Sequence, residues 1–332
     1  MREIKITAND AGRRLDRFLR KYLREASLGE IYKFIRKDVK VNGKRKNESY
    51  MLEDGDVLTL YLSDETLEKL LGKPSGRIAS KRTFSIIFED ENVLAVSKPA
   101  GLLTHGDAEN KKVHLSNQVR DYLIAKGEYN PRTEKVFAPA PSGRLDRNTS
   151  GIILFGKNSE ALRELNRLMR EGGIDKYYLT IACGIIEERM ELGGALQKDE
   201  EANKVKITSS ADSADSKEIV TVVSPLRYLN YGPGLDATLC EIQLVTGRTH
   251  QIRAHLASIG HPVIGDSKYA GRTARAINEY MRSGHSLSTQ LLHAARLEIS
   301  GAEGSLSYLN GQVFEAPLPP KFKNILNAGR QE

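Results

Sequence analysis

Ser142 to Gly151 is the segment of the sequence richest in side chains that can do chemistry. It reads Ser-Gly-Arg-Leu-Asp-Arg-Asn-Thr-Ser-Gly and sets one carboxylate, Asp146, between Arg144 and Arg147. Neighbouring positive charges favour the ionised form of an aspartate, and the hydroxyls and amides of a turn can fix its direction. A carboxylate held in this way can act as a nucleophile or as a general base. An Asx-turn that only holds a loop is the alternative, and this segment alone does not exclude it.

A second candidate segment runs from Thr246 to Leu256 and reads Thr-Gly-Arg-Thr-His-Gln-Ile-Arg-Ala-His-Leu. Its apolar spacing predicts a helix that Thr249 caps and that Gly260 ends. Residues 246–249 would then lie at the helix N-terminus, where free amides and the helix dipole favour a phosphate. Arg253 lies one turn further in. The positions that share the apolar face of this predicted helix are Ile252, Leu256 and Ile259.

A third segment, Lys176 to Gly184, reads Lys-Tyr-Tyr-Leu-Thr-Ile-Ala-Cys-Gly. Taken alone it predicts a strand that contains tyrosines, and a structural role explains it well enough. The sequence contains no glycine-rich dinucleotide fingerprint, no Walker loop and no nucleophile elbow.

Composition narrows the class of protein. The 332 residues are more than one compact domain usually needs and fewer than three would need. They are 39% hydrophobic and 28% charged, as in a globular protein. Apolar runs such as 152–155 are far shorter than the roughly 20 residues that span a bilayer. The first residues show no apolar core of a secretory signal, and two isolated cysteines, Cys183 and Cys240, cannot make a disulfide framework. We therefore expect a cytoplasmic protein without membrane contact.

The net charge of +7 is concentrated in one short segment. Residues 11–47 contain 13 Lys and Arg against 4 Asp and Glu, whereas the rest of the chain carries 37 against 39. A local cationic block favours a polyanionic partner such as a nucleic acid. A solvated helical face that keeps the protein in solution is the alternative, and charge alone does not decide between the two.

The same basic segment predicts a small module over residues 12–62. Two helices are indicated, followed by a strand, a tight turn at Asn42-Gly43, a second strand, and a further strand from 57 to 62. On the first helix Arg14, Arg17, Lys21 and Arg24 form a basic stripe, so one face can pack while the other meets phosphates. The apolar positions of the two helices are Leu15, Phe18, Leu19 and Tyr22 in the first and Ile31, Phe34 and Ile35 in the second.

Three histidines in or after the second candidate segment raise the question of a metal site. His250 and His255 lie about 140° apart around a helix because they are five residues apart. Two histidines four residues apart with an intervening Glu, the zinc-protease pattern, are missing. We therefore predict no metal, and we expect His250, His255 and His261 to cap, to hydrogen-bond or to contact RNA.

The remaining segments predict the domain boundaries. Residues 63–83 begin with an acidic stretch that can form a helix and end in a cluster of Gly and Pro, so they predict a linker. From residue 84 short apolar strands alternate with helices, and Asn158 would cap a helix closed by Gly172-Gly173. The polar stretch 198–217 predicts a loop.

The module at 12–62 resembles the αL RNA-binding module named after ribosomal protein S-four. Helix, helix, basic turn and short strand follow one another in the order of that module. The residues that carry the resemblance are Arg14-Leu15-Asp16, Ile31 to Ile35 and Val39-Lys40-Val41-Asn42-Gly43. A generic basic helical hairpin is the alternative.

The rest of the chain, from about 84 to 322, resembles the RluA-type pseudouridine synthase family. Five segments match in order, and the ordered set is far more specific than any one of them. The segments are Ile86 to His105 with Lys98-Pro99-Ala100-Gly101-Leu102-Leu103, Arg144 to Gly151, Lys176-Tyr177-Tyr178, Thr246 to Asp266, and Leu292-His293-Ala294.

The resemblance implies the fold and the chemistry. The fold would be α+β, a pseudouridine synthase domain at 84–325 around a mixed, mostly antiparallel sheet, preceded by the small α/β module. The catalytic residues would be Asp146, which attacks C1′ or removes the 2′-proton, Arg253 as its ion-pair partner, and Tyr178, which stacks on the uracil. No cofactor is implied, because no electrons move and no group is imported. The residues expected to contact RNA are Arg14, Arg17, Lys21, Lys37, Lys40, Lys44, Arg144, Arg147, Arg248 and His250.

The resemblance also implies a class of RNA substrate, and the sequence departs from the family pattern at two positions. Family members with this N-terminal module mostly act on large-subunit ribosomal RNA, so the expectation is a monomer that acts on that RNA. Transfer RNA, or a non-catalytic role in RNA binding or assembly, is the alternative. The family usually has His where this chain has Gly143, and a Gly often follows directly where Ala270-Gly271 follows Tyr269.

Overall fold

The computed structural model describes residues 1–72, 81–107, 113–199, 204–208 and 217–330. The chain forms two compact units, and two stretches within 84–325 group with the N-terminal residues. Among the described residues no helix is long and apolar enough to cross a membrane. The first unit comprises Met1–Arg82, Ser116–Ala140 and Gly156–Arg163, and the second Thr83–Leu115, Pro141–Phe155 and Glu164–Glu332.

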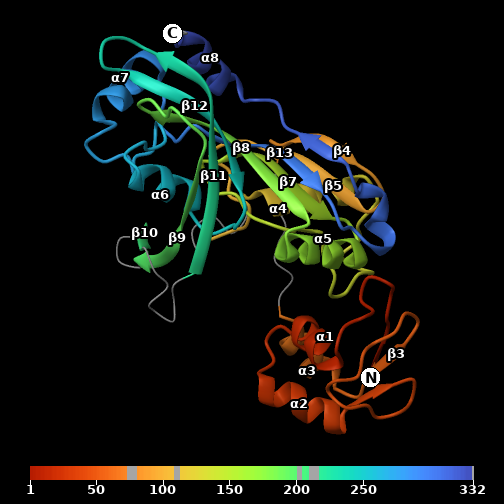
Figure 1. Ribbon diagram of the computed structural model, residues 1–332. Helices are drawn as coiled ribbons and strands as arrows, with labels where there is room; N and C mark the ends of the chain where they lie inside the picture. The colour runs from red at the N-terminus through yellow and green to blue at the C-terminus, as the bar shows by residue number, and fades with distance from the viewer. Residues whose placement is uncertain (73–80, 108–112, 200–203, 209–216, 331–332) are drawn as a thin grey trace. The chain divides into compact units, whose positions relative to one another are not determined.

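The N-terminal part of the first unit is a three-stranded antiparallel sheet packed with helices (Figure 1). Both helices expected there are confirmed, and their predicted apolar faces are buried in one core. The strand at residues 2–5 and its pairing with β3 were not predicted. The elements are β1 (Arg2–Lys5), α1 (Leu15–Tyr22), α2 (Leu28–Lys37), β2 (Val39–Val41), β3 (Val57–Leu60) and α3 (Asp64–Leu71).

Local chemistry explains where these elements begin and turn. Ser27 and Glu30 form a reciprocal capping box at the start of α2, which satisfies two of its free amides. Asn42 and Gly43 have φ of 50° and 74°, as a tight hairpin turn requires. Lys44 makes only an isolated bridge to Val41, so the expected strand after the turn is a single pairing, and β2 pairs with β3 instead.

Helix α3 lies within the stretch where a linker was expected. Leu67 and Leu70 on this helix are buried in the same core as α1 and α2. The acidic first part of 63–83 is therefore an ordered element of the first unit, while residues 73–80 lie outside the described part of the chain.

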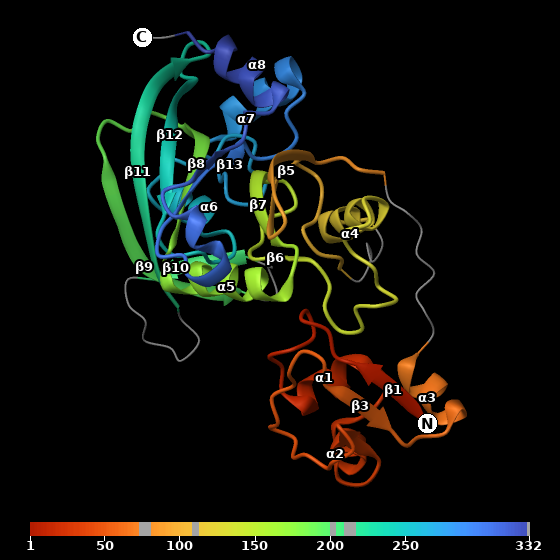
Figure 2. The ribbon, with the colours of Figure 1, turned by 90° about the vertical axis from the view of Figure 1, so that its right-hand side faces the viewer.

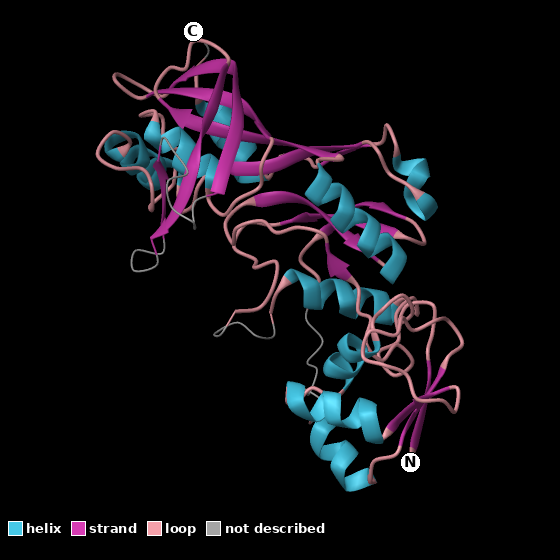
Figure 3. Ribbon diagram, turned by 60° about the horizontal axis from the view of Figure 1, so that its bottom comes forward, coloured by secondary structure: helices cyan, strands magenta, loops and turns pink. Residues whose placement is uncertain are grey.

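The second unit is built on an 11-stranded sheet within the described residues. Figure 3 draws the strands of both units in magenta. Where the register of a pairing in this sheet is described, it is antiparallel except for β13 with β7, which is parallel, so the predicted mixed, mostly antiparallel sheet is confirmed. The strands are β4 (Ser85–Glu89), β5 (Val93–Lys98), β6 (Ala140–Pro141), β7 (Ser150–Gly156), β8 (Ile174–Cys183), β9 (Met190–Asp199), β10 (Lys204–Thr208), β11 (Lys217–Asn230), β12 (Asp236–Leu244), β13 (Leu292–Ile299) and β14 (Val313–Glu315).

The expectation of a loop over 198–217 was wrong in part. Strand β10 lies within this stretch and pairs antiparallel with β9. Val205 and Ile207 alternate with lysines and pack against Leu196, Ile219 and Ala254. Long-range pairing and packing thus override a locally polar composition. Residues 200–203 and 209–216 lie outside the described part of the chain.

Strand β8 lies in the middle of the sheet, and helices cover both of its faces (Figure 2). Tyr178 and Ala182 pack with α6, whereas Ile181 and Cys183 pack with α7 and α8. This alternation follows from the two-residue period of a strand. The remaining helices are α4 (Leu115–Ala125), α5 (Ser159–Glu171), α6 (Gln251–Ser258), α7 (Arg275–His285), the 3₁₀ helix η1 (Gly304–Leu309) and α8 (Pro320–Ala328).

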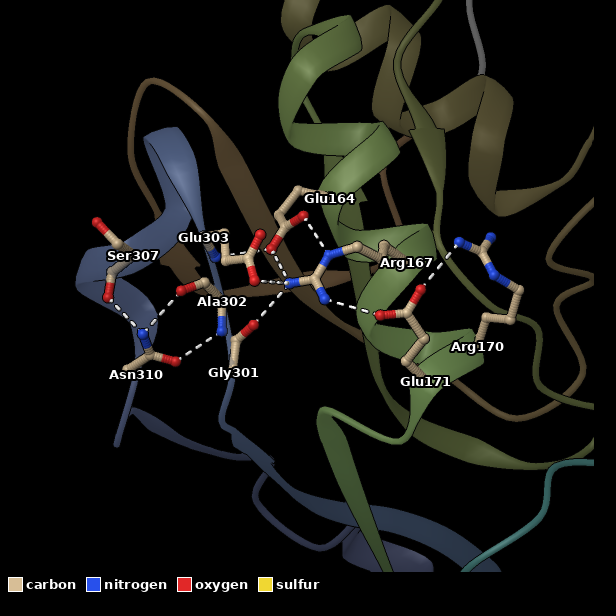
Figure 4. Close-up of polar contacts among 9 residues, drawn as sticks. All are labelled: Glu164, Arg167, Arg170, Glu171, Gly301, Ala302, Glu303, Ser307 and Asn310. Atoms are coloured by element: carbon tan, nitrogen blue, oxygen red, sulfur yellow. Dashed lines mark hydrogen bonds and ion pairs between the residues drawn. The ribbon is translucent and has the colours of Figure 1, made fainter.

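Helix α5 begins and ends as predicted. The Asn158 side chain accepts the N–H of Ala161, and Gly172 follows the helix with φ of 82°. Arg167 fixes its last turns by donating to Glu164, to Glu171 and to the carbonyl oxygen of Gly301, at 2.6–2.8 Å (Figure 4). The helix is thereby tied to the chain that follows β13.

Gly151 allows β7 and β13 to approach each other closely. Its φ is 116°, and an added Cβ would lie 2.1 Å from the carbonyl oxygen of Ala294, its partner in the parallel pairing. Gly151→Ala should therefore lower the free energy of unfolding by about 3 kcal/mol or more, because backbone would have to move apart. Urea unfolding followed by circular dichroism would measure this.

Gly284→Ala is the matched control, because this glycine of α7 has open space around its Cβ position. It should leave stability within about 1 kcal/mol of the wild type. Equal stabilities of the two variants would contradict the close approach at Gly151.

Candidate active site

A pocket of about 710 Å³ lies in the second unit, and the segments singled out from the sequence meet there. Asp146, Tyr178 and Arg253 all line it, so the structure brings the three expected catalytic residues together. Arg144, Arg147, Arg248 and His250 line it as well. The pocket is the one place in the described chain where the carboxylate, the tyrosine and the arginine can act on one ligand.

Lys98 and Thr104 hold the loop that carries Asp146. The Nζ atom of Lys98 donates to the carbonyl oxygens of Pro99, Leu102 and Arg147 at 2.8–3.0 Å, which uses all three donors of an ammonium group. Thr104 exchanges hydrogen bonds with Leu145. Burial lowers the pKa of Lys98 to about 7, and the charge of Asp146 opposes the shift.

Asp146 is paired with Arg253, as expected. Arg253 Nη1 donates to Asp146 Oδ2 at 3.1 Å; the Asp146 side chain is 24% exposed and that of Arg253 only 7%. The carboxylate thus faces the pocket while its counter-ion is buried. A hydrogen bond between a guanidinium and a carboxylate is charge-assisted, so this contact fixes the direction of the Asp146 side chain.

Asp266 holds Arg253 from the other side, and sequence reasoning missed it. Arg253 Nε and Nη2 donate to its two carboxylate oxygens at 2.6 and 2.9 Å. Asp266 also accepts the backbone N–H groups of Lys268 and Tyr269. Burial alone would raise the pKa of Asp266, but the hydrogen bonds from Arg253 and these amides bring it below its ordinary value. Asp266 is the last residue of the segment Thr246 to Asp266 that matches the family. The sequence therefore pointed to this position, but not to its pairing with Arg253.

His250 lies beside the same carboxylate. Its Nε2 is 3.8 Å from Asp146 Oδ2, and its Nδ1 is 3.0 Å from the Tyr269 hydroxyl, which accepts the N–H of Val205. When the hydroxyl donates to Nδ1, the neutral ring carries its proton on Nε2, toward Asp146. Burial lowers the pKa of His250, against the opposing charge of Asp146, and this favours the neutral ring.

The expected cap at Thr249 was wrong. Helix α6 starts at Gln251, and His250 is the N-cap residue with a left-handed φ of 58° and no side-chain cap. Gln251 instead accepts hydrogen bonds from the Thr246 hydroxyl and the Arg248 N–H. The end of the helix is as predicted, because Gly260 follows it with φ of 86°.

Tyr178 presents its side chain from β8 and is almost fully buried at the pocket wall. Burial, together with the charge of Asp146, raises the pKa of its phenol well above the ordinary value. The phenol therefore stays protonated at neutral pH. The environment thus favours a stacking role and disfavours a phenolate base.

The other predicted residues divide between the two units. Arg14 is hydrogen-bonded to Asp16, and Lys40 lies over the Tyr61 ring at 5.2 Å. Arg147 pairs with Asp107 at 3.1 Å on the pocket rim. Among the first-unit residues expected to contact RNA, those with exposed side chains are Arg17, Lys21, Lys37 and Lys44.

Gly143 lies beside Met169, and His255 and His261 are hydrogen-bonded within the fold. A Cβ on Gly143 would lie 2.9 Å from Met169 Cε, so Met169 occupies the space beside the backbone where the family usually has His. His255 bonds to Thr221, with its pKa lowered to about 4 by burial, and His261 Nδ1 donates to the carbonyl oxygen of Cys183. In the described part of the chain no three potential ligands gather as a metal site.

Comparison with known proteins identifies the family. The model of the RNA pseudouridylate synthase family matches residues 92–258. The chain belongs to this family. Ribosomal large subunit pseudouridine synthase C of Escherichia coli K12 is 32% identical, with 97% of this chain and 95% of the relative covered. The corresponding protein of Vibrio vulnificus is 31% identical, with 90% and 88% covered.

A solved structure agrees on the fold. Human RNA pseudouridylate synthase domain containing 4 superposes with a TM-score of 0.55 at 21% identity, over 74% of this chain and 93% of that one. The likeness shows the α+β fold that the sequence predicted. The family model and the relatives show that the protein is an RNA pseudouridine synthase, an isomerase.

Asp266 is expected to act as a positioning residue in this synthase. Asp266→Asn keeps the shape but replaces one acceptor with an N–H₂ group that faces the donors of Arg253. Arg253 should then lose its alignment with Asp146, and the single-turnover rate at saturating RNA should fall about 100-fold with RNA affinity within about three-fold.

Asp236→Asn is a suitable control, since this half-buried carboxylate accepts a hydrogen bond from Asn230 outside the pocket. It should keep the wild-type rate. If Asp266→Asn lowered the melting temperature but kept its rate well below that temperature, Asp266 would serve only the fold.

Proposed function

We propose that this synthase converts uridine to pseudouridine in large-subunit ribosomal RNA and that Asp146 starts the reaction. The observation that carries the assignment is the partly exposed Asp146 carboxylate, ion-paired to buried Arg253 at the wall of the pocket. The relatives named for the large ribosomal subunit, which align over nearly the whole chain, support the substrate.

The reaction is an internal rearrangement of one nucleotide. The bond between N1 of uracil and C1′ of the ribose breaks, the freed base turns, and C5 bonds to C1′. The proton that C5 loses is balanced by one gained at N1, so nothing is imported. Asp146 either attacks C1′ or removes the 2′-proton, and both routes need an ionised carboxylate with open access to the pocket.

The neighbouring residues have distinct roles in this proposal. Arg253 orients Asp146 by a charge-assisted hydrogen bond, and Asp266 holds the Arg253 guanidinium in the plane that allows it to pair with both carboxylates. Tyr178 supports the uracil through its ring, as a protonated phenol. His250 can donate its Nε2 proton to the same carboxylate or to the ribose beside it. No step calls for a cofactor or metal ion.

The target uridine must leave its stack to reach Asp146, which costs a few kcal/mol in paired RNA. Phosphate contacts offset this cost, and Arg144 and Arg248 at the pocket can make them. We assign the same task to the first unit, whose residues 12–62 resemble an RNA-binding module. We also propose that the protein acts as a monomer in the cytoplasm, which size-exclusion chromatography and cell fractionation would test.

Asp146→Asn tests the assignment directly. The substitution is nearly isosteric and removes only the charge and basicity, so turnover should be abolished while RNA affinity stays within a few fold. Pseudouridine mapping of RNA from cells that carry the wild-type gene, the variant or a deletion would identify the modified uridine.

In the deletion strain and in the variant strain a large-subunit uridine should lose its modification. Loss at a transfer-RNA site instead would redirect the substrate assignment. A variant with even a tenth of the wild-type single-turnover rate would refute the role of Asp146.

The RNA-binding role of the first unit can be tested without deleting it. Arg17, Lys37 and Lys44 have exposed side chains, and their joint replacement by Gln removes three charges without touching the core. If all three contact phosphates of single-stranded RNA, the log–log salt slope of binding should shrink by about 2. The single-turnover rate at saturating RNA should persist.

Gln at Arg272, Arg282 and Lys323, which are exposed on and around α7 and α8, is the matched control for lost charge. Its salt slope should be that of the wild type. Identical slopes for the two triple variants would show that the basic stripe is only a solvated face.

A further inference from the structure

Lys176 is a buried cation that the reaction as described above leaves without a task. It lies in β8, which pairs with β12 on one side and β13 on the other, so its side chain leaves the sheet in a fixed direction. Residues two apart on a strand share a face, and both Lys176 and Tyr178 line the pocket. Lys176 is 9% exposed. It therefore brings a positive charge to the pocket wall, two residues before Tyr178 on the same face of β8.

Within the described residues, no side chain or carbonyl group pairs with the ammonium group of Lys176. Asp175 is the acidic group that influences it, but successive residues of a strand point to opposite faces, and Asp175 accepts a hydrogen bond from Gln243. Burial lowers the pKa of Lys176, and Asp175 opposes the shift. A buried cation without an acceptor is stabilised when an anion binds beside it.

The carboxylates of the pocket are not available to supply that anion. Asp107 is paired with Arg147 at 3.1 Å, and Asp146 is paired with Arg253 at the same distance. Because both acids are matched by arginines, the charge of Lys176 remains uncompensated on the pocket side. The anion that fits must therefore come with the substrate.

The loop that faces Lys176 suits a phosphate. The Cβ position of Gly247 is 3.9 Å from Lys176 Nζ, so the ammonium group lies against the backbone of this loop. Arg248 of the same loop lines the pocket, and the loop leads into the N-terminal end of α6. Two cations from different elements thus line one pocket, and the loop of one lies against the other.

We propose, given the RNA substrate proposed above, that Lys176 binds a backbone phosphate adjacent to the target uridine, with Arg248 as its neighbour. Two residues along a strand span about 7 Å, so a base stacked on Tyr178 leaves Lys176 facing the sugar–phosphate backbone beside it. The contact would hold the flipped nucleotide by its backbone while Asp146 acts on the ribose.

Lys176→Met tests this contact, because methionine keeps the unbranched length and removes the charge. On an RNA fragment that contains the mapped uridine, the variant should bind about ten-fold more weakly, with a salt slope smaller by about 0.7. Its single-turnover rate at saturating RNA should fall by a smaller factor than its affinity, because the contact acts chiefly on binding. Lys176→Arg should retain most of the affinity, and Lys323→Met on α8 should change nothing.

A neutral methylphosphonate linkage placed 5′ or 3′ of the target uridine identifies the phosphate itself. At one of the two positions the wild type should lose about as much affinity as Lys176→Met does, and the variant should lose nothing more. Independent, additive losses would overturn the proposal. So would an unchanged affinity with a fallen saturating rate, which would place the uracil on Lys176 instead. Failure of the proposed function is distinct from both, since the wild type itself would then form no pseudouridine in any large-subunit fragment.

Discussion

The buried guanidinium of Arg253 is the interaction on which the rest of the site depends. One planar fork joins two carboxylates from different segments, Asp146 on the loop before β7 and Asp266 after α6. Burying three charges is costly, and the cost is recovered only when geometry and hydrogen bonding are nearly complete. The two carboxylates differ in this respect. Asp266 is fully buried and receives two further amides, whereas Asp146 keeps an open side toward the pocket.

The backbone around this ion pair is assembled with little tolerance. Gly151 lets β7 lie against β13, and the Ser150 hydroxyl is 2.8 Å from His293 Nδ1, while His293 Nε2 donates to the carbonyl oxygen of Ala316. The loop that carries Asp146 is thus fixed at its C-terminal end, where β7 begins, by a buried chain of hydrogen bonds. At its near end Lys98 fixes it by binding the carbonyl oxygen of Arg147. A carboxylate between two such anchors has few conformations to lose when substrate binds.

Features that depend on neighbouring residues alone could be predicted from the sequence. The faces of α1 and α2, the cap at Asn158, the turn at Asn42-Gly43 and the helix end at Gly260 follow from periodicity and side-chain chemistry, and all are confirmed. The pairing of Asp146 with Arg253 was accessible only through resemblance, because the two residues are 107 positions apart. Strand β10 was missed since its stability comes from β9 and α6, not from its own residues. Thr249 was the best cap by residue type, yet Gln251 satisfies the amide of Arg248 and leaves His250 to turn the chain.

Two buried lysines show why burial alone does not reveal function. Lys98 is buried and donates each of its three N–H groups to a carbonyl oxygen, so its role is to hold a loop in place. Lys176 is nearly as buried, but its surroundings within the described chain supply no such acceptors, and the pocket supplies the space. A protein has no structural reason to desolvate a cation without a partner, since a methionine of similar shape would cost less. The difference between the two lysines therefore indicates that Lys176 binds a ligand that carries negative charge into the pocket. The phosphate backbone of RNA brings such a charge next to a uridine.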